Sequence, residues 1–313
     1  MYTGLKSMRE AFGDALVTLG KQNEQVVVLT ADLTDAIKVG EFKKLFPHRF
    51  YQMGIKESDM MGTAAGMAID GRIPFATTFA AFATSLANQP IRVSIGYNNA
   101  NVKIATSHGG MCVGADGATH QSFEDIGLMR LIPNMTIIVP CDANEAYKAT
   151  MAASRIDGPV YLRFGRIPTL VVTKETDDFV VGKGNVLRKG NDIAIVATGM
   201  MVPTSLEAAR ELEKEGIKAR VINIHTVKPL DDELILTAAR ECGAIVTCEE
   251  HSIIGGLGSA VSDLLAKNHP TPLSMVGVLD TFGESGEPDE ILEKYHLTSR
   301  DIVAQVRHVL NKK

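Results

Sequence analysis

The sequence predicts an α/β protein built from two consecutive domains with mainly parallel sheets. Short runs of β-branched residues alternate with longer segments of helical periodicity, which is the pattern of βαβ units. The 313 residues are enough to form two hydrophobic cores. Hydrophobic residues make up 45% of the chain and charged residues 22%, as in ordinary globular proteins. The 28 glycines and the absence of Trp favour close packing of helices on sheets.

The first domain is predicted over residues 1–170. Its predicted helices are 57–70 and 81–97, and its predicted strands are 25–31, 74–79, 101–106, 136–140 and 159–163. Polar or aromatic residues end or follow these strands, namely Asp32, Phe79, His108, Arg163 and Arg166. Ligands of open α/β sheets bind at the carboxyl ends of the strands. We therefore expect these residues to converge on one edge of the sheet.

The regular alternation lapses in a charged segment, which predicts a linker over residues 171–188, and it resumes in a second domain over 189–313. The predicted elements there are strands 192–198, 218–224 and 244–248, helices 203–215 and 231–241, and a helix after Gly255–Gly258. The glycine turn has a geometry suited to a phosphate at a helix N-terminus. It is neither a complete Gly-x-Gly-x-x-Gly motif nor followed by Lys-Ser/Thr, which favours a role in packing.

The charge balance and the cysteines exclude several classes of function. The net charge of -5 and a pI near 5.9 argue against binding to nucleic acid or to an anionic membrane. The N-terminal residues contain no signal-peptide core, and no apolar stretch is long enough to span a bilayer, so we expect a cytoplasmic protein. The four cysteines form no Cys-x-x-Cys pair, and Cys248 near His251 is too little for zinc. We expect reduced thiols and no metal site within this chain.

The loop Gly114–Gln121, with His108 shortly before it, is the strongest candidate for a functional site. It combines Asp116 and His120 with two glycines that let the backbone approach a ligand. A carboxylate and an imidazole can bind sugar hydroxyls and move protons near neutral pH. The alternative is an ordinary turn whose Asp caps a helix and whose histidines are only polar.

Other candidate residues also allow two interpretations. Glu57 begins a predicted apolar helix, where an acidic side chain is favoured by the helix dipole alone. Phe79 and Phe82 are either core residues or a stacking face for a flat heterocycle, since small residues surround them. Arg163 and Arg166 present planar forks suited to phosphate or carboxylate, although surface arginines are common.

Together these residues form a pattern that none of them supports alone. The order Gly-Ile-x-Glu, Thr-Phe-x-x-Phe, Ser-His, Gly-x-Asp-Gly-x-Thr-His-Gln and Gly-Pro-x-x-Leu-x-x-x-Arg resembles the pyrimidine-binding domain of transketolases. The segment Glu249–Gly258 resembles the transketolase C-terminal domain, and the resemblance covers essentially the whole chain. The sequence is thus similar to the C-terminal half of a transketolase encoded as a separate subunit. This resemblance implies two three-layer αβα domains.

The resemblance implies thiamine diphosphate as the cofactor, with Mg²⁺ on its diphosphate. Glu57 matches the glutamate that hydrogen-bonds the aminopyrimidine ring and promotes its imino tautomer, and the phenylalanines match positions around that ring: Phe79 and Phe82. Asp116 and His120 match groups that hold the ketose hydroxyls and assist proton transfer. The phosphate end of the sugar is matched by His108 and Arg166. By their place at the same sheet edge, we add Asp32 to the cofactor-binding residues and Arg163 to the substrate-binding residues.

Several positions depart from the family pattern. Ser58-Asp59 stands where relatives often have His-Ala or Gln-Asn, and Ser85 takes the place of a third aromatic residue. Ala36 replaces a phosphate-binding serine, and Lys6 is predicted in place of an N-terminal arginine of the phosphate site. These departures leave the thiamine prediction in place and leave the identity of the sugar open.

The diphosphate and Mg²⁺ motif of the family, Gly-Asp-Gly followed by a distant Asn, is missing from the chain. A diphosphate with its metal needs oxygen ligands and a helix N-terminus. We therefore expect an N-terminal-half partner subunit that carries this motif, active sites between the chains, and an α2β2 heterotetramer.

The predicted activity is transfer of a two-carbon ketol unit from a ketose or ketose phosphate to an aldose, as in the pentose phosphate pathway. The main alternative is the β subunit of a 2-oxoacid dehydrogenase E1 component, but the Asp116–His120 loop with His108 favours a polyol substrate. A fragment of a deoxyxylulose-phosphate synthase is a weaker alternative, because such enzymes are usually single long chains. A scaffold with a decayed site is disfavoured because the candidate residues are present together.

Overall fold

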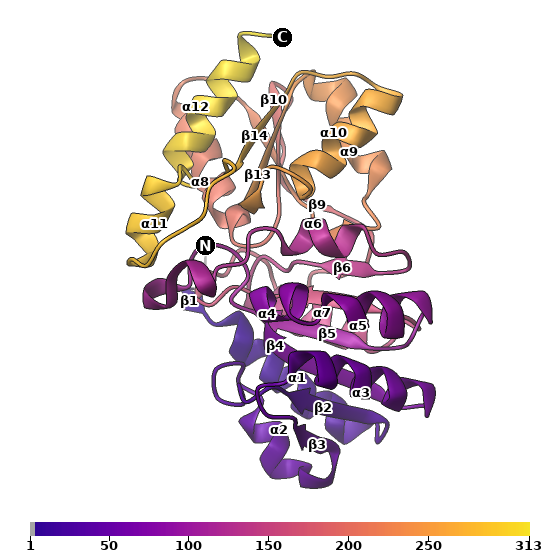
Figure 1. The fold of residues 1–313 in the computed structure, drawn as a ribbon. Coiled ribbons are helices and arrows are strands. Elements are labelled where there is room, and N and C mark those ends of the chain that lie inside the picture. The colour runs from indigo at the N-terminus through magenta and orange to yellow at the C-terminus, as the bar shows by residue number, and fades with distance from the viewer. Residues whose placement is uncertain (1–3) are drawn as a thin grey trace.

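The computed structural model describes residues 4–313 as two α/β domains, one above the other in Figure 1. Residues 1–3, which belong to the N-terminal segment without a signal-peptide core, lie outside the described residues. The first domain runs from indigo to magenta in the lower half of the view, and the second runs to yellow at the top. No helix within residues 4–313 has the length and apolar character needed to cross a membrane.

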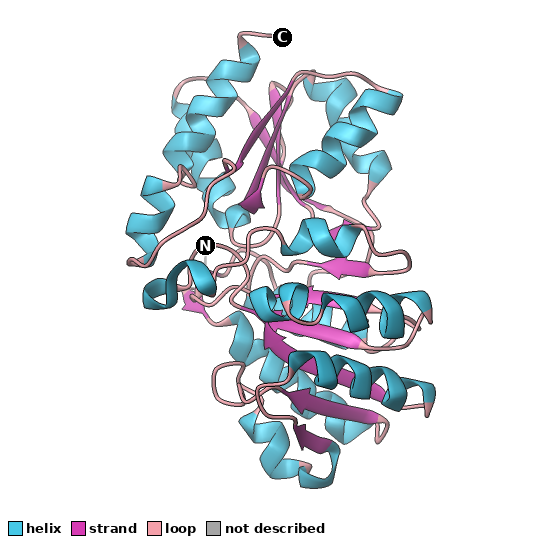
Figure 2. Ribbon diagram, in the orientation of Figure 1, coloured by secondary structure: helices cyan, strands magenta, loops and turns pink. Residues whose placement is uncertain are grey.

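The first domain is built on a seven-stranded sheet with the order β12-β6-β7-β5-β4-β2-β3. All neighbouring strands are parallel except β12, which is antiparallel to β6. Figure 2 shows the strands of this domain, in magenta, with helices packed beside them. The strands are β2 (Val26–Thr30), β3 (Phe50–Gln52), β4 (Ile73–Phe79), β5 (Lys103–Ser107), β6 (Thr136–Ile138), β7 (Val160–Arg163) and β12 (Thr226–Lys228). Four adjacent parallel strands, β7, β5, β4 and β2, therefore end at one edge of the sheet.

Helices cover both faces of this sheet, as predicted. They are α1 (Met8–Gln22), α2 (Gly40–Leu45), α3 (Glu57–Ile69), α4 (Ala80–Ser85), α5 (Asn88–Pro90), α6 (Asp125–Arg130) and α7 (Ala143–Ala153). Successive side chains of β2 enter two different cores, because neighbouring residues of a strand point to opposite faces. Val26 and Val28 pack with α1 and α7, whereas Val27 and Leu29 pack with α3 and the helices after it.

The single helix predicted over 81–97 is wrong. The structure has α4, α5 and then a π-helical turn at Ile91–Tyr97. Pro90 lies in the middle of this region, where it has no N–H to donate to the preceding turn. The break divides the segment into short pieces that pack against α3.

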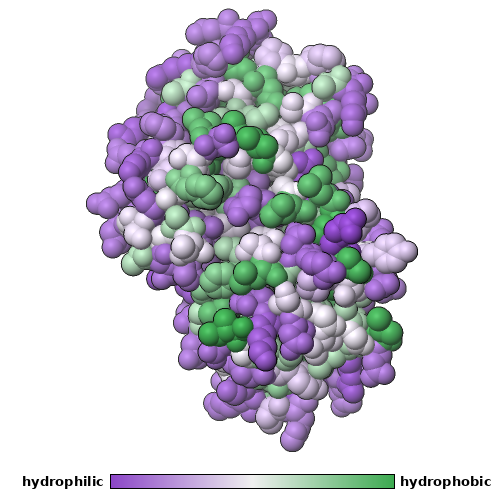
Figure 3. Space-filling model, in the orientation of Figure 1, coloured by the Kyte–Doolittle hydropathy of each residue, from purple (hydrophilic) through white to green (hydrophobic). Residues whose placement is uncertain are grey.

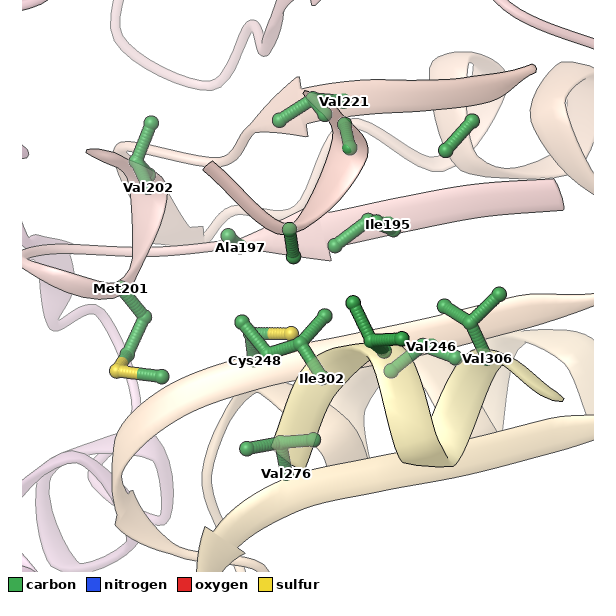
Figure 4. Packing of buried hydrophobic residues seen from close by; sticks show 14 of the residues in the cluster. Ile195, Ala197, Met201, Val202, Val221, Val246, Cys248, Val276, Ile302 and Val306 are labelled. Carbon is green, nitrogen blue, oxygen red and sulfur yellow. The ribbon is translucent and has the colours of Figure 1, made fainter. Parts of the chain in front are cut away.

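The second domain has a five-stranded sheet with the order β14-β13-β10-β11-β9, parallel except for β9. Its strands are β9 (Asn185–Arg188), β10 (Ile193–Ala197), β11 (Ala219–Asn223), β13 (Ile245–Ser252) and β14 (Leu273–Val278). Its helices are α8 (Met201–Lys214), α9 (Asp232–Cys242), α10 (Leu257–Asn268), α11 (Pro288–Lys294) and α12 (Ser299–Leu310). Figure 4 shows one of its two cores, in which Ile302 and Val306 of α12 lie against Ile195 and Val246 of the sheet.

Two features join the domains. The predicted linker 171–188 ends in β9, which already belongs to the second sheet. After β11 the chain crosses back, and β12 adds a strand to the edge of the first sheet beside β6.

Within the first domain, a separate two-stranded sheet pairs β1 (Leu5–Lys6) with β8 (Thr169–Leu170). The domain boundaries at 170 and 189 stay predictions, and the chain passes between the two sheets more than once.

Candidate active site

The edge where β4 and β5 end carries a stacked pair of rings. Phe79 is the last residue of β4 and His108 follows β5 directly. Their ring centroids lie 3.7 Å apart with an angle of 26° between the planes. His108 adopts a φ of 59°, and its Nδ1 atom lies 2.9 Å from the Ser107 hydroxyl. Parallel strands thus deliver these two side chains to one point, as predicted.

His120 and Phe82 complete a cluster of four rings with this pair, which we call the aromatic cluster. The loop after His108 contains a 3₁₀ segment, Gly114–Thr119, that is interrupted at Gly117, where φ is 68°. His120 follows this segment, and its ring lies 5.2 Å from that of Phe82. Phe82 in turn lies 5.6 Å from Phe79. The loop therefore brings its histidine to the carboxyl edge of the sheet.

Glu57 is the first residue of α3, and only 4% of it is exposed. Its carboxylate accepts one long hydrogen bond, from the Thr78 hydroxyl at 3.5 Å. Within the described residues it makes no hydrogen bond to the N–H groups of its own first turn, so it is not a simple helix cap. A buried carboxylate with one weak partner retains free acceptor capacity, and such groups often occur at functional sites.

A cationic group lies beside the aromatic cluster. Arg9 of α1 donates to the backbone oxygens of Arg166 (2.8 Å) and Ala36 (2.6 Å). Arg166 donates to the Val113 oxygen in the loop that carries His120. Burial, followed by the charges of Arg9, Arg166 and His120, lowers the pKa of His108 to about 3. His108 is therefore a neutral hydrogen-bonding group next to two guanidinium groups.

The sequence patterns did not point to Arg9. Lys6 was predicted instead as the N-terminal basic residue of the phosphate site. Lys6 is an exposed residue of β1, whereas Arg9 is partly buried and its Nε atom has no hydrogen-bond partner among residues 4–313. Burial and the charge of Arg166 lower the pKa of Arg9. The available signal was an arginine within the apolar repeat Met8, Phe12, Leu16 of a helix capped by Ser7.

Arg163, predicted as a substrate ligand, is the last residue of β7 and is buried. Its guanidinium is buried in an ion pair with Asp125 at 2.7 Å. It also donates to the backbone oxygens of Ser122 (3.1 Å) and Glu250 (3.0 Å). Because the guanidinium is buried among these partners and its bond to Glu250 O reaches the second domain, we leave Arg163 out of the proposed substrate site.

The two aspartates of the prediction are exposed. Asp32 lies directly after β2 with a φ of 61°, and its N–H donates to Gln52 Oε1 at 2.8 Å. Asp116 lies in the 3₁₀ segment before His120. Both are therefore at the carboxyl edge of the sheet or in the loop above it, open to solvent.

The glycine turn of the second domain serves packing, as favoured from the sequence. The buried Glu249 carboxylate accepts hydrogen bonds from Leu257 N and Gly258 N, each at 2.7 Å, and so occupies the N-terminus of α10. A Cβ atom on Gly258 would lie 2.8 Å from the sulfur of Met275. This helix start is filled by the chain's own carboxylate.

All four cysteines are free and buried, and burial raises the pKa of Cys248 to about 12. Within residues 4–313, no group of three His, Cys, Asp or Glu side chains is arranged to hold a metal ion.

Comparisons with known proteins agree with the two-domain fold. The model of the transketolase pyrimidine-binding domain matches residues 5–169, and that of the transketolase C-terminal domain matches residues 182–302. A 6-deoxy-6-sulfo-D-fructose transketolase subunit from Clostridium sp. (strain MSTE9) is 42% identical, covering 98% of this chain and 95% of its own. A putative transketolase C-terminal section from Methanocaldococcus jannaschii is 41% identical, covering 98% and 97%.

A solved structure of a split-gene transketolase, an inactive β4 tetramer, is 50% identical with a TM-score of 0.92 and covers 97% of this chain and 98% of its own. These likenesses extend over both domains in one chain. The chain belongs to the transketolase family and corresponds to its pyrimidine-binding and C-terminal domains, the half that split transketolases carry as a separate subunit.

Proposed function

We propose that this chain is one half of a thiamine diphosphate-dependent transketolase that transfers a two-carbon ketol unit from a ketose or its phosphate to an aldose. The observation that carries the proposal is the buried, weakly bonded Glu57 carboxylate, together with the aromatic cluster gathered at the carboxyl edge of one sheet. Membership of the transketolase family supports it. So does the name of the Clostridium relative, a transketolase subunit for a sulfonated ketose.

The residues present fit thiamine diphosphate. Glu57 has acceptor capacity for a donor such as an aminopyrimidine nitrogen, because within residues 4–313 its carboxylate accepts one long hydrogen bond, from Thr78. Phe82 is half-buried and offers part of its ring to a flat heterocycle, with Phe79 buried behind it. When bound, the cofactor supplies a thiazolium ylid that stabilises the carbanion of the ketol unit. Asp32 is proposed to contact it from the end of β2.

We assign the other residues to the sugar. His120 and Asp116 hold the hydroxyls of the ketose, and His120 moves a proton at its imidazole. His108 is neutral and donates or accepts a hydrogen bond, while Arg166 and Arg9 attract an anionic end such as phosphate or sulfonate. These contacts orient the substrate at a distance from the reacting carbon.

The chain is proposed to work with an N-terminal-half subunit that binds the diphosphate and Mg²⁺, in an α2β2 assembly. The missing Gly-Asp-Gly and Asn motif supports this. Figure 3 shows apolar side chains on the face covered by α3, α5 and α6. Exposed apolar residues of this region include Ile55, Ile69, Leu86, Tyr97, Leu131 and Ile254. The Ser58 hydroxyl donates to Leu86 O at 2.5 Å, which ties α3 to the segment after α4.

Free cysteines support a reducing compartment, the cytoplasm. The split-gene relative, described as an inactive β4 tetramer, supports the need for a partner.

The test is reconstitution of the chain with its candidate partner, thiamine diphosphate and Mg²⁺. Ketol transfer from xylulose 5-phosphate, fructose 6-phosphate and 6-deoxy-6-sulfofructose to an aldose acceptor is measured in parallel with the decarboxylation of pyruvate and branched 2-oxo acids. Transfer from at least one ketose supports the proposal. Turnover of a 2-oxo acid with none of the ketoses would instead identify the β subunit of a 2-oxoacid dehydrogenase.

A further inference from the structure

We infer that the C-terminal domain takes part in the reaction by holding the segment Gly109–Gln121, the substrate loop, with Glu250 as its positioning residue. The inference rests on the proposed function, because it concerns the loop that carries Asp116 and His120. The second domain thereby positions residues of the proposed active site in the first domain.

Glu250 belongs to β13 of the second domain, yet its carboxylate binds the backbone of the first. Its Oε1 atom accepts hydrogen bonds from Met111 N at 2.7 Å and Cys112 N at 2.8 Å. Only 3% of Glu250 is exposed. If its carboxylate were removed, water could not easily take its place as the acceptor for these two N–H groups. Two successive N–H groups that converge on one carboxylate oxygen fix the direction of the loop where it leaves the sheet.

Glycine makes this approach possible. Gly110 has a φ of 96°, and a Cβ atom on it would overlap the Glu250 carboxylate. A Cβ atom on Gly109 would lie 2.7 Å from Arg163 Nε. The pair Gly109-Gly110 therefore lets the substrate loop begin in direct contact with two charged side chains of the domain interface.

Arg163 links the end of the substrate loop to the backbone of Glu250. It donates to Glu250 O and to Ser122 O while it is paired with Asp125. Gly110 and Ser122 exchange backbone hydrogen bonds of 2.6 and 3.1 Å. Both ends of the substrate loop are thus tied to each other and to the second domain.

A second contact holds the far side of the loop. Gln121 Nε2 donates to Met111 O at 2.8 Å and to Glu284 O at 2.9 Å, which spans the loop and reaches the second domain. The Ser285 hydroxyl donates to Ala115 O at 3.0 Å, next to Asp116. A Cβ atom on Gly283 would lie 2.6 Å from Gln121 Cδ, so this segment packs tightly on the loop.

The neighbouring Glu249 provides a matched control. Both glutamates are buried, lie on β13 and accept two backbone hydrogen bonds of similar length. Those of Glu249 come from Leu257 and Gly258 of its own domain, and those of Glu250 come from the substrate loop. A general loss of stability follows from either change, whereas loosening of the loop follows only from the change at Glu250.

The experiment compares the full chain with Glu250→Ala, Glu250→Gln, Glu249→Ala and Glu249→Gln by hydrogen exchange and mass spectrometry, in the absence of substrate. We expect Glu250→Ala to accelerate exchange in peptides covering 109–122 by about tenfold or more, because two buried N–H groups lose their acceptor. Glu250→Gln retains an amide oxygen and stays within about threefold of the wild type. Glu249→Ala alters peptides around 255–260 and leaves 109–122 within about twofold.

Equal exchange of 109–122 in Glu250→Ala and the wild type, or an equal acceleration in Glu249→Ala, overturns the inference. Should Glu250→Ala not fold, Ser285→Ala replaces it, since Ser285 is exposed and its one bond to the loop can be removed at the surface. We then expect about twofold faster exchange near Ala115, and unchanged exchange overturns the inference.

A kinetic readout follows with the partner subunit present. We expect Glu250→Ala to raise KM for the ketose by about tenfold, with rescue by Glu250→Gln and little change in the apparent affinity for thiamine diphosphate. Unchanged KM in Glu250→Ala contradicts the positioning role. The exchange measurement needs no turnover, so a wild-type assembly without ketol transfer would refute the proposed function while the exchange data still decide the role of Glu250.

Discussion

His108 illustrates how packing sets the charge of a single side chain. Its pKa is about 3 in the folded chain, because of burial and then the charges of Arg9, Arg166 and His120. In the unfolded chain its pKa is near 6.5. Between these values the unfolded state binds more protons, so the contribution of His108 to stability is complete above pH 6.5 and is lost as the pH falls toward 3.

We therefore expect His108→Asn to resist acid better than the wild type. Relative to the variant, the wild-type chain should lose about 1–2 kcal/mol of unfolding free energy between pH 7 and pH 4.5. Urea unfolding of both proteins at a series of pH values measures this difference. Parallel pH curves for the two proteins would show that His108 is not held neutral by the fold.

Glu57 yields a prediction about activity. In the assembly with the partner subunit, Glu57→Gln should lower kcat for ketol transfer by about 10²- to 10⁴-fold, the usual contribution of a proton-transfer group. Asp59→Asn is the control, because Asp59 is an exposed acid in the same first turn of α3 and should retain activity within about twofold. Full activity in Glu57→Gln would remove the proposed role of this carboxylate.

At the residue scale, the sequence predicts the site best where a residue directly ends a strand. Phe79 and His108 follow parallel neighbours and meet at the expected edge. Arg163 satisfies the same rule, but Asp125 and Glu250 lie far from it in the chain and their contact with it could not be predicted. Arg9 was missed because α1 itself was not predicted from the sequence.

At the scale of elements, buried strands were predicted well because their apolar runs are short and bounded. Strands β2, β4, β5, β10 and β11 lie within two residues of their predictions. Helices α7 and α12 were not predicted, although α12 begins with a capping box and has one apolar face. β12 could not be predicted as part of the first sheet, since its three residues pair with β6 through tertiary contact alone.

The capping box at the start of α12 makes a contribution to stability that can be measured. The Thr298 side chain and Asp301 form a capping box, and α12 then buries Ile302, Val303 and Val306 in a core of the second domain. Thr298→Ala should destabilise the chain by about 0.5–2 kcal/mol, because the N–H groups of the first turn lose a partner. Urea unfolding measures the change, with Ser299→Ala as the neighbouring control. An equal effect of both substitutions would contradict the assigned cap.

At the scale of the whole molecule, Glu145 joins the two domains. Its carboxylate accepts from Cys141 N at 2.9 Å and from Asn223 Nδ2 of the second domain at 2.7 Å. Burial raises the pKa of Glu145 to about 7. The folded chain thus binds an extra proton between about pH 4.5 and 7, so this contribution to stability is present in acid and is lost as the pH rises through 7.

We expect Glu145→Gln to remove that loss. A glutamine at this position can accept from Cys141 N. Once the Asn223 amide turns over, the glutamine can also donate to Asn223 Oδ1, a buried atom with no partner in the described part of the chain. From pH 5 to pH 8 the wild type should lose about 1–3 kcal/mol relative to the variant. Urea unfolding of both proteins at a series of pH values across this range measures the difference. A variant whose unfolding free energy has the same pH dependence as that of the wild type would contradict the role of Glu145.

The division of the chain into two α/β domains follows from the sequence, but the way the domains serve each other does not. Strand crossing by β12, the Glu145–Asn223 contact and the hold of Glu250 on the substrate loop all join residues distant in the chain. A single sequence contains no local signal for such contacts. The absence of the diphosphate motif, by contrast, can be read directly from the sequence. It is the reason for proposing a partner subunit.

We propose that this chain contributes half of a transketolase site shared with a partner subunit. The most direct measurement is a titration of the chain with the N-terminal-half subunit, at saturating thiamine diphosphate, Mg²⁺ and ketose donor, with ketol transfer as the readout. We predict no turnover by the chain alone and a rate that rises to a plateau at one partner per chain. Ketol transfer by the chain without the partner would contradict the claim.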